Sequence, residues 1–207
     1  YNQNNPYHKY DLWHHTLNVV KACHNCDYIT KLAALFHDIG KPDTMTVDEI
    51  TGFNHYYGHA EVSADITRKI LNRLKFSNKE KNDILALIEN HIEFLVNDSD
   101  KNIRRIIHKI GKENAIRLAY LTYADDEAKS LNNRHNDLIN KVLKVIHNFD
   151  IPKVSDLALT GYDLMKLGYI GKEIGEIKNY LLDKVLDEGI PNDKEVLLDL
   201  VLQKTQV

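Results

Sequence analysis

Hydrophobic and polar residues follow one another along most of this chain with the spacing of amphipathic α-helices, and runs of alternating β-branched residues are scarce. Asp11 can cap a first helix that runs to about Ala22. A short apolar helix opens at Thr30 and is expected to end near Gly40. Residues 42–57 lack a clear period and are expected to form a loop. The remaining patterns predict helices at 58–74, 77–97, 100–109, 112–131 and 134–148. The chain is therefore predicted to be all-α.

Capping and helix-breaking residues mark the ends of helices and divide this pattern into two parts. Ser77 and Glu80 match a capping box at the start of one helix. The segment FDIPKVSD interrupts the pattern at Pro152, and helical pieces resume in TGYDLMKLG and in the run from Glu173 to Asp187. We therefore predict a helical-bundle domain over 1–150 and a small helical C-terminal extension over 151–207.

Composition narrows the functional classes. The 207 residues are 43% hydrophobic and 28% charged, with a net charge of −3, which is ordinary for a soluble globular protein. A net charge this close to zero argues against strong non-specific binding to nucleic acid or to an anionic membrane. No apolar run reaches the roughly 18–20 residues that span a bilayer, and no signal peptide is visible. Two cysteines make no disulfide framework, so the cytoplasm is the expected compartment. The chain begins at Tyr1, so we expect it to be trimmed or cut from a larger protein.

Candidate metal ligands recur along the chain. His37 and Asp38 lie side by side just before Gly40, and an opening last helical turn lets both side chains swing toward one centre. Asp125 lies on a largely apolar helix, where a carboxylate costs several kcal/mol unless it is paired or binds a metal. Histidine and aspartate suit Fe, Mn, Ni, Co or Zn, and Mg is also considered. Further candidate residues are His14, His15, His55, His59, His91 and Asp126.

The ordered set resembles a known family. The segments NPYHKYDLWHHTLNVV, LAALFHDIGKP, FNHYYGHAEVSA, ILNRLKFSNKE and NHIEF, with the following Asp125, are similar to the HD superfamily of metal-dependent phosphohydrolases. They look most like the HD region of bacterial tRNA nucleotidyltransferases, the CCA-adding enzymes. The segment LALTGYDLMKLGYIGKEIGEIKNYLLDKVLDEGIPND is similar to the C-terminal tail of those enzymes. The resemblance implies an HD-domain helical bundle.

The resemblance also implies residue roles. The core metal ligands would be His15, His37, Asp38 and Asp125. A His-rich branch of the family holds a second metal, for which His59 and His91 match, with Asp38 bridging the two ions. His15 rather than His14 matches the motif, and Asp126 is expected to face outward. One or two divalent ions are therefore expected.

Other residues are expected to bind the substrate. Lys41 follows the helix end, where it can hold a phosphate oxygen or assist proton movement. Arg104 and Arg105 are candidate phosphate clamps, and His55 is either a substrate contact or part of the loop structure.

These roles predict a hydrolase of phosphate esters of nucleotides or RNA ends, acting on a phosphomonoester or a 2′,3′-cyclic phosphate through metal-activated water. No paired-aspartate nucleotidyl-transfer motif occurs in the sequence, so CCA addition by this chain alone is not expected, and a link to tRNA stays open. Two alternatives remain. One is a non-catalytic nucleotide- or RNA-binding module, such as the rear half of an RNA-processing enzyme, and the other is a nucleoside triphosphohydrolase. No membrane partner is expected, and the sequence leaves the oligomeric state open.

Overall fold

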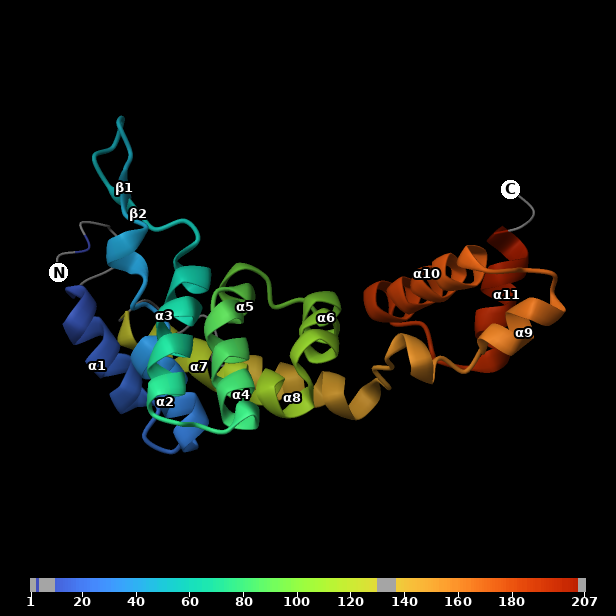
Figure 1. Ribbon diagram of the computed structural model, residues 1–207, viewed down its shortest axis with the longest axis horizontal. Coiled ribbons are helices and arrows are strands. Elements are labelled where there is room, and N and C mark those ends of the chain that lie inside the picture. The colour runs from blue at the N-terminus through green and yellow to red at the C-terminus, as the bar shows by residue number, and fades with distance from the viewer. Residues whose placement is uncertain (1–2, 4–9, 130–136, 205–207) are drawn as a thin grey trace. The chain divides into compact units, whose positions relative to one another are not determined.

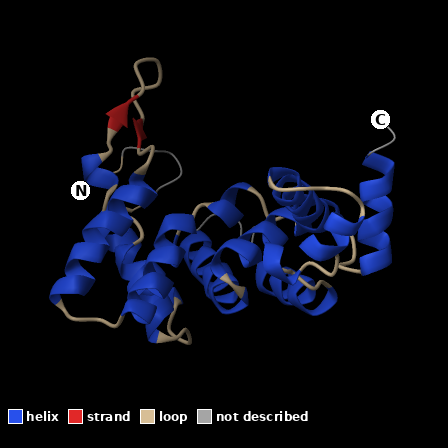
Figure 2. Ribbon diagram, turned by 45° about the vertical axis from the view of Figure 1, so that its right-hand side comes forward, coloured by secondary structure: helices blue, strands red, loops and turns tan. Residues whose placement is uncertain are grey.

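The protein is built almost wholly from helices, as the computed structural model shows for residues 3, 10–129 and 137–204 (Figure 1). Within these residues the strands are confined to a two-stranded antiparallel hairpin, β1 (Thr46–Val47) and β2 (Asn54–His55) (Figure 2). The predicted all-α class is confirmed. Each helix in this part of the chain is too short or too polar to traverse a lipid bilayer.

The chain forms two compact units. The first comprises residues 1–98 and 113–140, and the second comprises 99–112 and 141–207. The helices of the first unit are α1 (Leu12–Ala22), α2 (Tyr28–Phe36), α3 (His59–Arg73), α4 (Asn78–Asn90), α5 (Glu93–Val96) and nearly all of α7 (Lys112–Ala128). The second unit contains α6 (Asp100–Ile110), most of α8 (Leu138–Asn148), α9 (Gly161–Lys166), α10 (Lys172–Glu188) and α11 (Lys194–Lys204). This division differs from the single break expected near residue 150, because α6 packs on α10.

Local capping fixes where the helices of the first unit begin. The Asp11 carboxylate accepts hydrogen bonds from the backbone N–H groups of Trp13 and His14 at the start of α1. Ser77 and Glu80 form the predicted capping box at the start of α4. α4 packs on both α2 and α3, and this contact is the centre of the unit. Fully buried core side chains of the unit include Val19, Ala33, Leu71, Leu87 and Leu118.

Three sequence expectations about helix ends need correction. The helix predicted over 77–97 is broken: α4 ends at Asn90, His91 caps it, and α5 begins at Glu93. The helix expected from Thr30 begins earlier, because Asp27 caps it by accepting from the Thr30 N–H, and it ends at Phe36. The expected loop over 42–57 contains the β1–β2 hairpin, and its first two residues belong to the short 3-10 helix η1 (Lys41–Asp43). All three changes lie at or near the candidate ligands.

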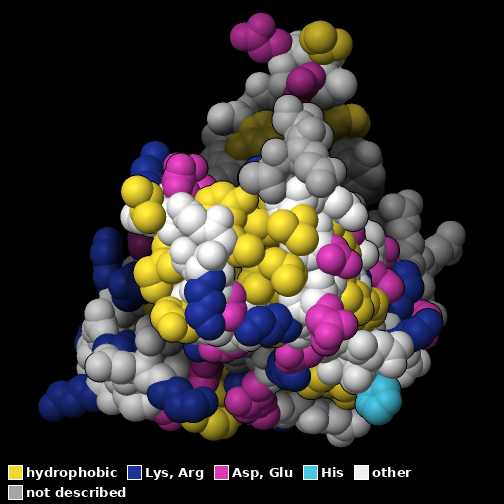
Figure 3. Space-filling view, turned by 90° about the vertical axis from the view of Figure 1, so that its right-hand side faces the viewer, with side chains coloured by type: hydrophobic (Ala, Val, Ile, Leu, Met, Phe, Trp, Pro, Cys, Tyr) yellow, Lys and Arg dark blue, Asp and Glu magenta, His cyan; other side chains and the backbone are white. Residues whose placement is uncertain are grey.

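The second unit has its own apolar core and an exposed apolar surface. Fully buried Leu159, Leu164, Leu181 and Leu197 join α9, α10 and α11. Four large apolar side chains in and after α9 are nevertheless exposed, namely Tyr162, Met165, Leu167 and Ile170. Figure 3 shows hydrophobic side chains gathered on one face with charged side chains around them. This unit contributes none of the six predicted metal ligands.

Candidate metal centre

The turn after α2 brings His37 and Asp38 into the interior. His37 is the C-terminal cap of α2, and both side chains are almost fully buried. Gly40 holds the turn against α3, because its N–H donates to the Ser63 hydroxyl at 2.9 Å. A Cβ at Gly40 would lie 2.6 Å from the Ser63 backbone nitrogen, so only glycine allows this approach. The sequence attributes the end of the helix to Gly40, but α2 ends at Phe36, and Gly40 instead allows the turn to approach the backbone of α3 closely.

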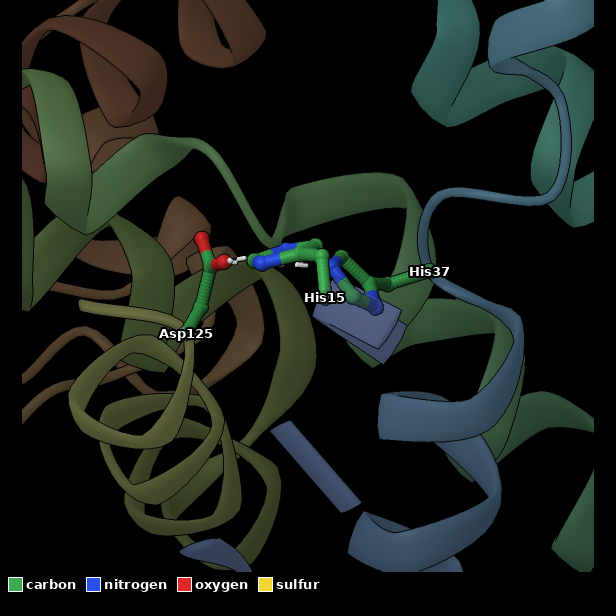
Figure 4. Close-up of side chains that lie close together, drawn as sticks. All are labelled: His15, His37 and Asp125. Atoms are coloured by element: carbon green, nitrogen blue, oxygen red, sulfur yellow. Dashed lines mark ion pairs between the residues drawn. The ribbon is translucent and has the colours of Figure 1, made fainter. Parts of the chain in front are cut away.

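A first donor group joins three elements of the first unit. His15 comes from α1, His37 from the end of α2 and Asp125 from α7, and their side chains point toward one another (Figure 4). One ligand atom from each residue lies within 4.8 Å of the others. The His15 Nε2 and Asp125 Oδ1 atoms are 3.0 Å apart, and the His37 Nε2 atom is 3.9 Å from the same oxygen. All three residues are buried.

A second donor group lies next to the first and is formed by Asp38, His59 and His91. The Asp38 Oδ1 atom is 3.3 Å from His59 Nε2 and 3.7 Å from His91 Nε2, and these two nitrogens are 3.0 Å apart. The other carboxylate oxygen, Asp38 Oδ2, is 3.5 Å from His15 Nε2 and 3.3 Å from His37 Nε2. Asp38 thus presents one oxygen to each group of donors.

Local hydrogen bonds orient three of the histidine rings. The Nδ1 atom of His37 contacts the Ala34 carbonyl oxygen at 2.9 Å. The same contact occurs at 2.7 Å from His59 to Tyr56 and from His91 to Ile88. A carbonyl oxygen only accepts, so each Nδ1 carries the proton and each Nε2 directs its lone pair at the donor groups.

Electrostatics hold three of these groups, Asp38, Asp125 and His91, in the protonation states that bind metals. Burial opposes protonation of His37, but the carboxylates of Asp38 and Asp125 outweigh it and raise the pKa of that imidazole. Burial alone would raise the pKa of Asp38, but His37 and Lys41 outweigh it and hold that pKa well below the ordinary value. Burial opposes ionisation of Asp125 in the same way, and Lys129 leads the interactions that keep its pKa well below normal. Burial, followed by the neighbouring His37, lowers the pKa of His91 to about 3. The carboxylates are therefore ionised and His91 is neutral near pH 7.

The donor atoms fit divalent metal ions. Within the described residues, the buried His37 Nε2 and Asp125 Oδ1 atoms make no hydrogen bond of acceptable geometry, although each has polar neighbours. Buried polar atoms are rarely left in this state unless they serve a ligand. Imidazole nitrogens with carboxylate oxygens are a donor set that Zn, Fe, Mn, Co and Ni accept. Each of the two donor groups combines imidazole and carboxylate donors.

A cavity of about 270 Å³ opens onto the donor groups. Its lining combines metal-ligand candidates, two lysines, aromatic rings and two aliphatic side chains: Asp38, Lys41, His55, Tyr56, Tyr57, His59, His91, Ile92, Leu95, Asp125 and Lys129. All of these residues belong to the first compact unit. The predicted residues Lys41 and His55 are therefore placed beside the candidate ligands.

A buried lysine and a partly buried lysine pair with the two carboxylates. The Lys41 Nζ atom is 2.7 Å from Asp38 Oδ2 and 3.0 Å from the Gln3 side-chain oxygen. The Lys129 Nζ atom is 2.6 Å from Asp125 Oδ2, and this ion pair outweighs burial and raises the pKa of Lys129. Sequence reasoning missed Lys129. Its position four residues after Asp125 on one helix was the available signal.

Three other expectations from the sequence concern the His14–His15 pair, Asp126 and the two arginines of α6. His14 is exposed and pairs with Asp11, so His15 is the member of the pair that joins the donor group. Asp126 was expected to face outward, but the structure buries it. The structure gives Arg104 and Arg105 partners on α10. The Arg104 guanidinium donates to the carbonyl oxygens of Leu186 and Asp187, and Arg105 pairs with Asp183 and Asp187.

These contacts predict a stability role for Arg104. The side chain is 6% exposed and lies over the Phe149 ring, so Arg104→Leu leaves buried carbonyl oxygens at the end of α10 without their charged donor. We expect the free energy of unfolding, measured by urea denaturation, to fall by about 2–3 kcal/mol. The half-exposed neighbour provides the control, since Arg105→Gln should cost less than about 1 kcal/mol. A phosphate-clamp role for Arg104 would instead lower substrate affinity with no loss of stability.

The fold and the donor groups define the class: an all-α protein with a candidate divalent-metal centre built from histidine and aspartate. The family described as tRNA nucleotidyltransferase domain 2 matches residues 55–201, which is most of the chain. The chain belongs to this family, and the predicted resemblance to tRNA nucleotidyltransferases is confirmed. The matched range includes His59, His91 and Asp125, while His15, His37 and Asp38 precede it.

Two curated relatives support the assignment. An A-adding tRNA nucleotidyltransferase of Deinococcus radiodurans is 34% identical over 129 residues, which cover 59% of this chain and 29% of the relative. A CC-adding tRNA nucleotidyltransferase of Thermus thermophilus is 29% identical over 196 residues, covering 91% of this chain and 44% of the relative. The chain therefore spans less than half the length of these relatives.

Proposed function

We propose that the donor groups bind two divalent metal ions and that the protein hydrolyses phosphate esters of nucleotides or RNA ends. The observation that carries the proposal is the placement of Asp38, whose two oxygens face two separate sets of donors. His15, His37 and Asp125 would hold one ion, His59 and His91 the other, and Asp38 would bridge them. When bound, such ions supply Lewis acidity and lower the pKa of a coordinated water to near neutrality.

The charges of the cavity favour an anionic substrate once metal is present. Asp38 and Asp125 carry two negative charges, which Lys41 and Lys129 balance within hydrogen-bonding distance. The neutral His91 adds no charge. Each divalent ion therefore adds its charge to a lining that is already balanced, and a phosphate dianion is the complement. Lys41 and Lys129 would hold the two carboxylates in place and help to orient the phosphate oxygens.

Family membership links the proposed activity to tRNA. The relatives are tRNA nucleotidyltransferases, so we infer that this chain has a tRNA-linked role and that RNA ends are among its substrates. The exposed apolar side chains in and after α9 favour a second candidate function, an RNA-binding module without turnover. The two functions differ in whether a phosphate bond is broken.

A reconstitution experiment tests the proposal. The purified chain is stripped of metal, loaded in turn with Mn²⁺, Fe²⁺, Co²⁺, Ni²⁺, Zn²⁺ or Mg²⁺, and assayed on nucleoside monophosphates, 2′,3′-cyclic nucleotides and RNA with a terminal phosphate. We expect turnover that requires added metal and about two ions bound per chain. Nucleoside triphosphates complete the panel, because release of triphosphate or pyrophosphate instead of orthophosphate would identify a triphosphohydrolase. RNA binding without turnover under every condition would favour the binding module.

A further inference from the structure

The mouth of the metal-centre cavity carries a pair of stacked aromatic rings. His55 ends β2 and Tyr57 follows two residues later, and both line the cavity. Their ring centroids are 5.3 Å apart and their planes differ by 7°. Tyr57 lies in the turn that leads from β2 to α3, and this turn brings its ring against that of His55. The intervening Tyr56 is buried instead, and its hydroxyl donates to the Gln3 carbonyl oxygen at 2.7 Å.

The outer ring of this pair is available to a ligand. Tyr57 is 78% exposed, a large value for an aromatic side chain. His55 covers part of the tyrosine ring, and the Nε2 atom of His55 lies 3.8 Å from an Asp48 carboxylate oxygen. The ring of Tyr57 is therefore supported from one side while most of its surface faces solvent. Such a supported, exposed ring is suited to stacking on another flat ring.

Apolar side chains complete this mouth. Ile92 is 40% exposed and follows the candidate ligand His91 directly, and Leu95 lines the same cavity one turn further along. Tyr57 stands two residues before the other candidate ligand, His59. The chain thus places aromatic and aliphatic surface within two residues of both histidines of the second donor group. The cavity lining therefore combines the charged and ligating side chains with exposed aromatic and aliphatic ones.

We propose that Tyr57, supported by His55 and joined by Ile92, is a nucleobase-stacking platform that positions the substrate's phosphate over the donor groups. The inference rests on the proposed function and deepens it, because it names the residues that would select phosphate esters with a nucleobase over sugar phosphates without one. Every nucleobase has a π-face, so the platform accepts any base and gives affinity with little base selectivity. Tyr57 acts as a specificity-determining residue, and the bond-breaking step belongs to the donor groups.

Two probes that differ only in the base test this inference. Adenosine 5′-monophosphate and ribose 5-phosphate carry the same phosphomonoester, and the Mn²⁺-loaded full chain is assayed on both. Tyr57→Ala should raise the KM for adenosine 5′-monophosphate about tenfold or more, because base stacking on an aromatic ring contributes on that scale. The KM for ribose 5-phosphate and the kcat for both probes should stay within about twofold of the unaltered protein.

Two further variants separate stacking from general damage. Tyr57→Phe keeps the ring and should retain the KM of the unaltered protein for adenosine 5′-monophosphate. Tyr120→Ala removes an exposed tyrosine of α7 that lines a different cavity, and it should change neither KM. A parallel rise in KM for both probes in Tyr57→Ala, or an unchanged ratio between them, overturns the platform.

The outcomes distinguish this inference from the proposed function. Turnover of both probes with a base preference that Tyr57→Ala leaves unchanged removes the platform and leaves the hydrolase standing. If the unaltered protein hydrolyses neither probe, hydrolysis of these monoesters fails, and calorimetry of adenosine 5′-monophosphate binding then decides the platform. Tighter binding of adenosine 5′-monophosphate than of ribose 5-phosphate, lost in Tyr57→Ala, supports it. Equal binding of the two probes, or no binding of either, overturns it.

Discussion

Replacing Asp38 by asparagine should remove the ability of the protein to hold metal and, with it, phosphate release. The carboxylate faces donors on both sides, and the amide that replaces it has no charge and only one oxygen. Loss of a residue that merely orients a ligand costs roughly 10–100-fold in metal affinity or activity, so loss of the bridging ligand should cost at least about 100-fold. Elemental analysis of the purified variant and a phosphate-release assay measure the two effects.

A nearby aspartate provides a matched control for this variant. Asp43 lies in η1, five residues further along, and is exposed. Asp43→Asn makes the same change in net charge and should retain the metal content and activity of the unaltered protein. Circular dichroism should show that both variants keep their helical content. An Asp38→Asn protein that is folded and as active as the unaltered one would falsify the metal mechanism.

Replacing Gly40 by alanine should destabilise the first unit and disturb the second donor group together. The added Cβ would lie 2.6 Å from the Ser63 nitrogen and 2.8 Å from the His59 carbonyl oxygen. Both atoms belong to the backbone of α3 and cannot rotate away, so α3 must shift. Overpacking of this kind costs about 1–3 kcal/mol or more in free energy of unfolding. Because α3 begins at His59, the shift should also weaken binding of the second ion.

The same substitution at another glycine should have the opposite sign. Gly175 lies within α10, and an added Cβ there would meet no atom within 4 Å. Gly175→Ala should therefore raise the free energy of unfolding by about 0.5–1 kcal/mol, because alanine restricts the unfolded chain and favours helix. Urea denaturation and metal titration of the two variants compare the effects. Equal stability of Gly40→Ala and the unaltered protein would show that α3 can yield at no cost.

The starts of α1 and α4 could be predicted from the sequence because their caps are local. Asp11 and the Ser77–Glu80 pair each bond to backbone groups within three residues, and both were found where the pattern placed them. The end of α4 could not be predicted in this way. The apolar pattern continues through Ile92, and no glycine or proline marks a stop at His91. The break is a tertiary feature that turns the His91 ring toward Asp38.

The candidate site was predictable in its members but less so in its surroundings. The family resemblance supplied the six residues that the structure brings together, and their roles as ligands stay a prediction. Adjacent Arg104 and Arg105 look alike in the sequence, and only the packing of α6 on α10 shows that one of them is a buried cap. The burial of Asp126 was also missed, because a mostly apolar helix does not reveal which of two neighbouring aspartates is covered.

The contacts that orient the three histidine rings have a consequence for which metal the proposed centre would carry. His37, His59 and His91 each bond to a carbonyl oxygen three residues earlier, so each ring is held by its own stretch of backbone. Exchange of one ion for another then requires no rearrangement of the helices. A frame of this kind favours ions in the general order of divalent-ion affinity for nitrogen and oxygen donors. The resident metal would therefore reflect the supply of each ion in the cell as much as the shape of the site.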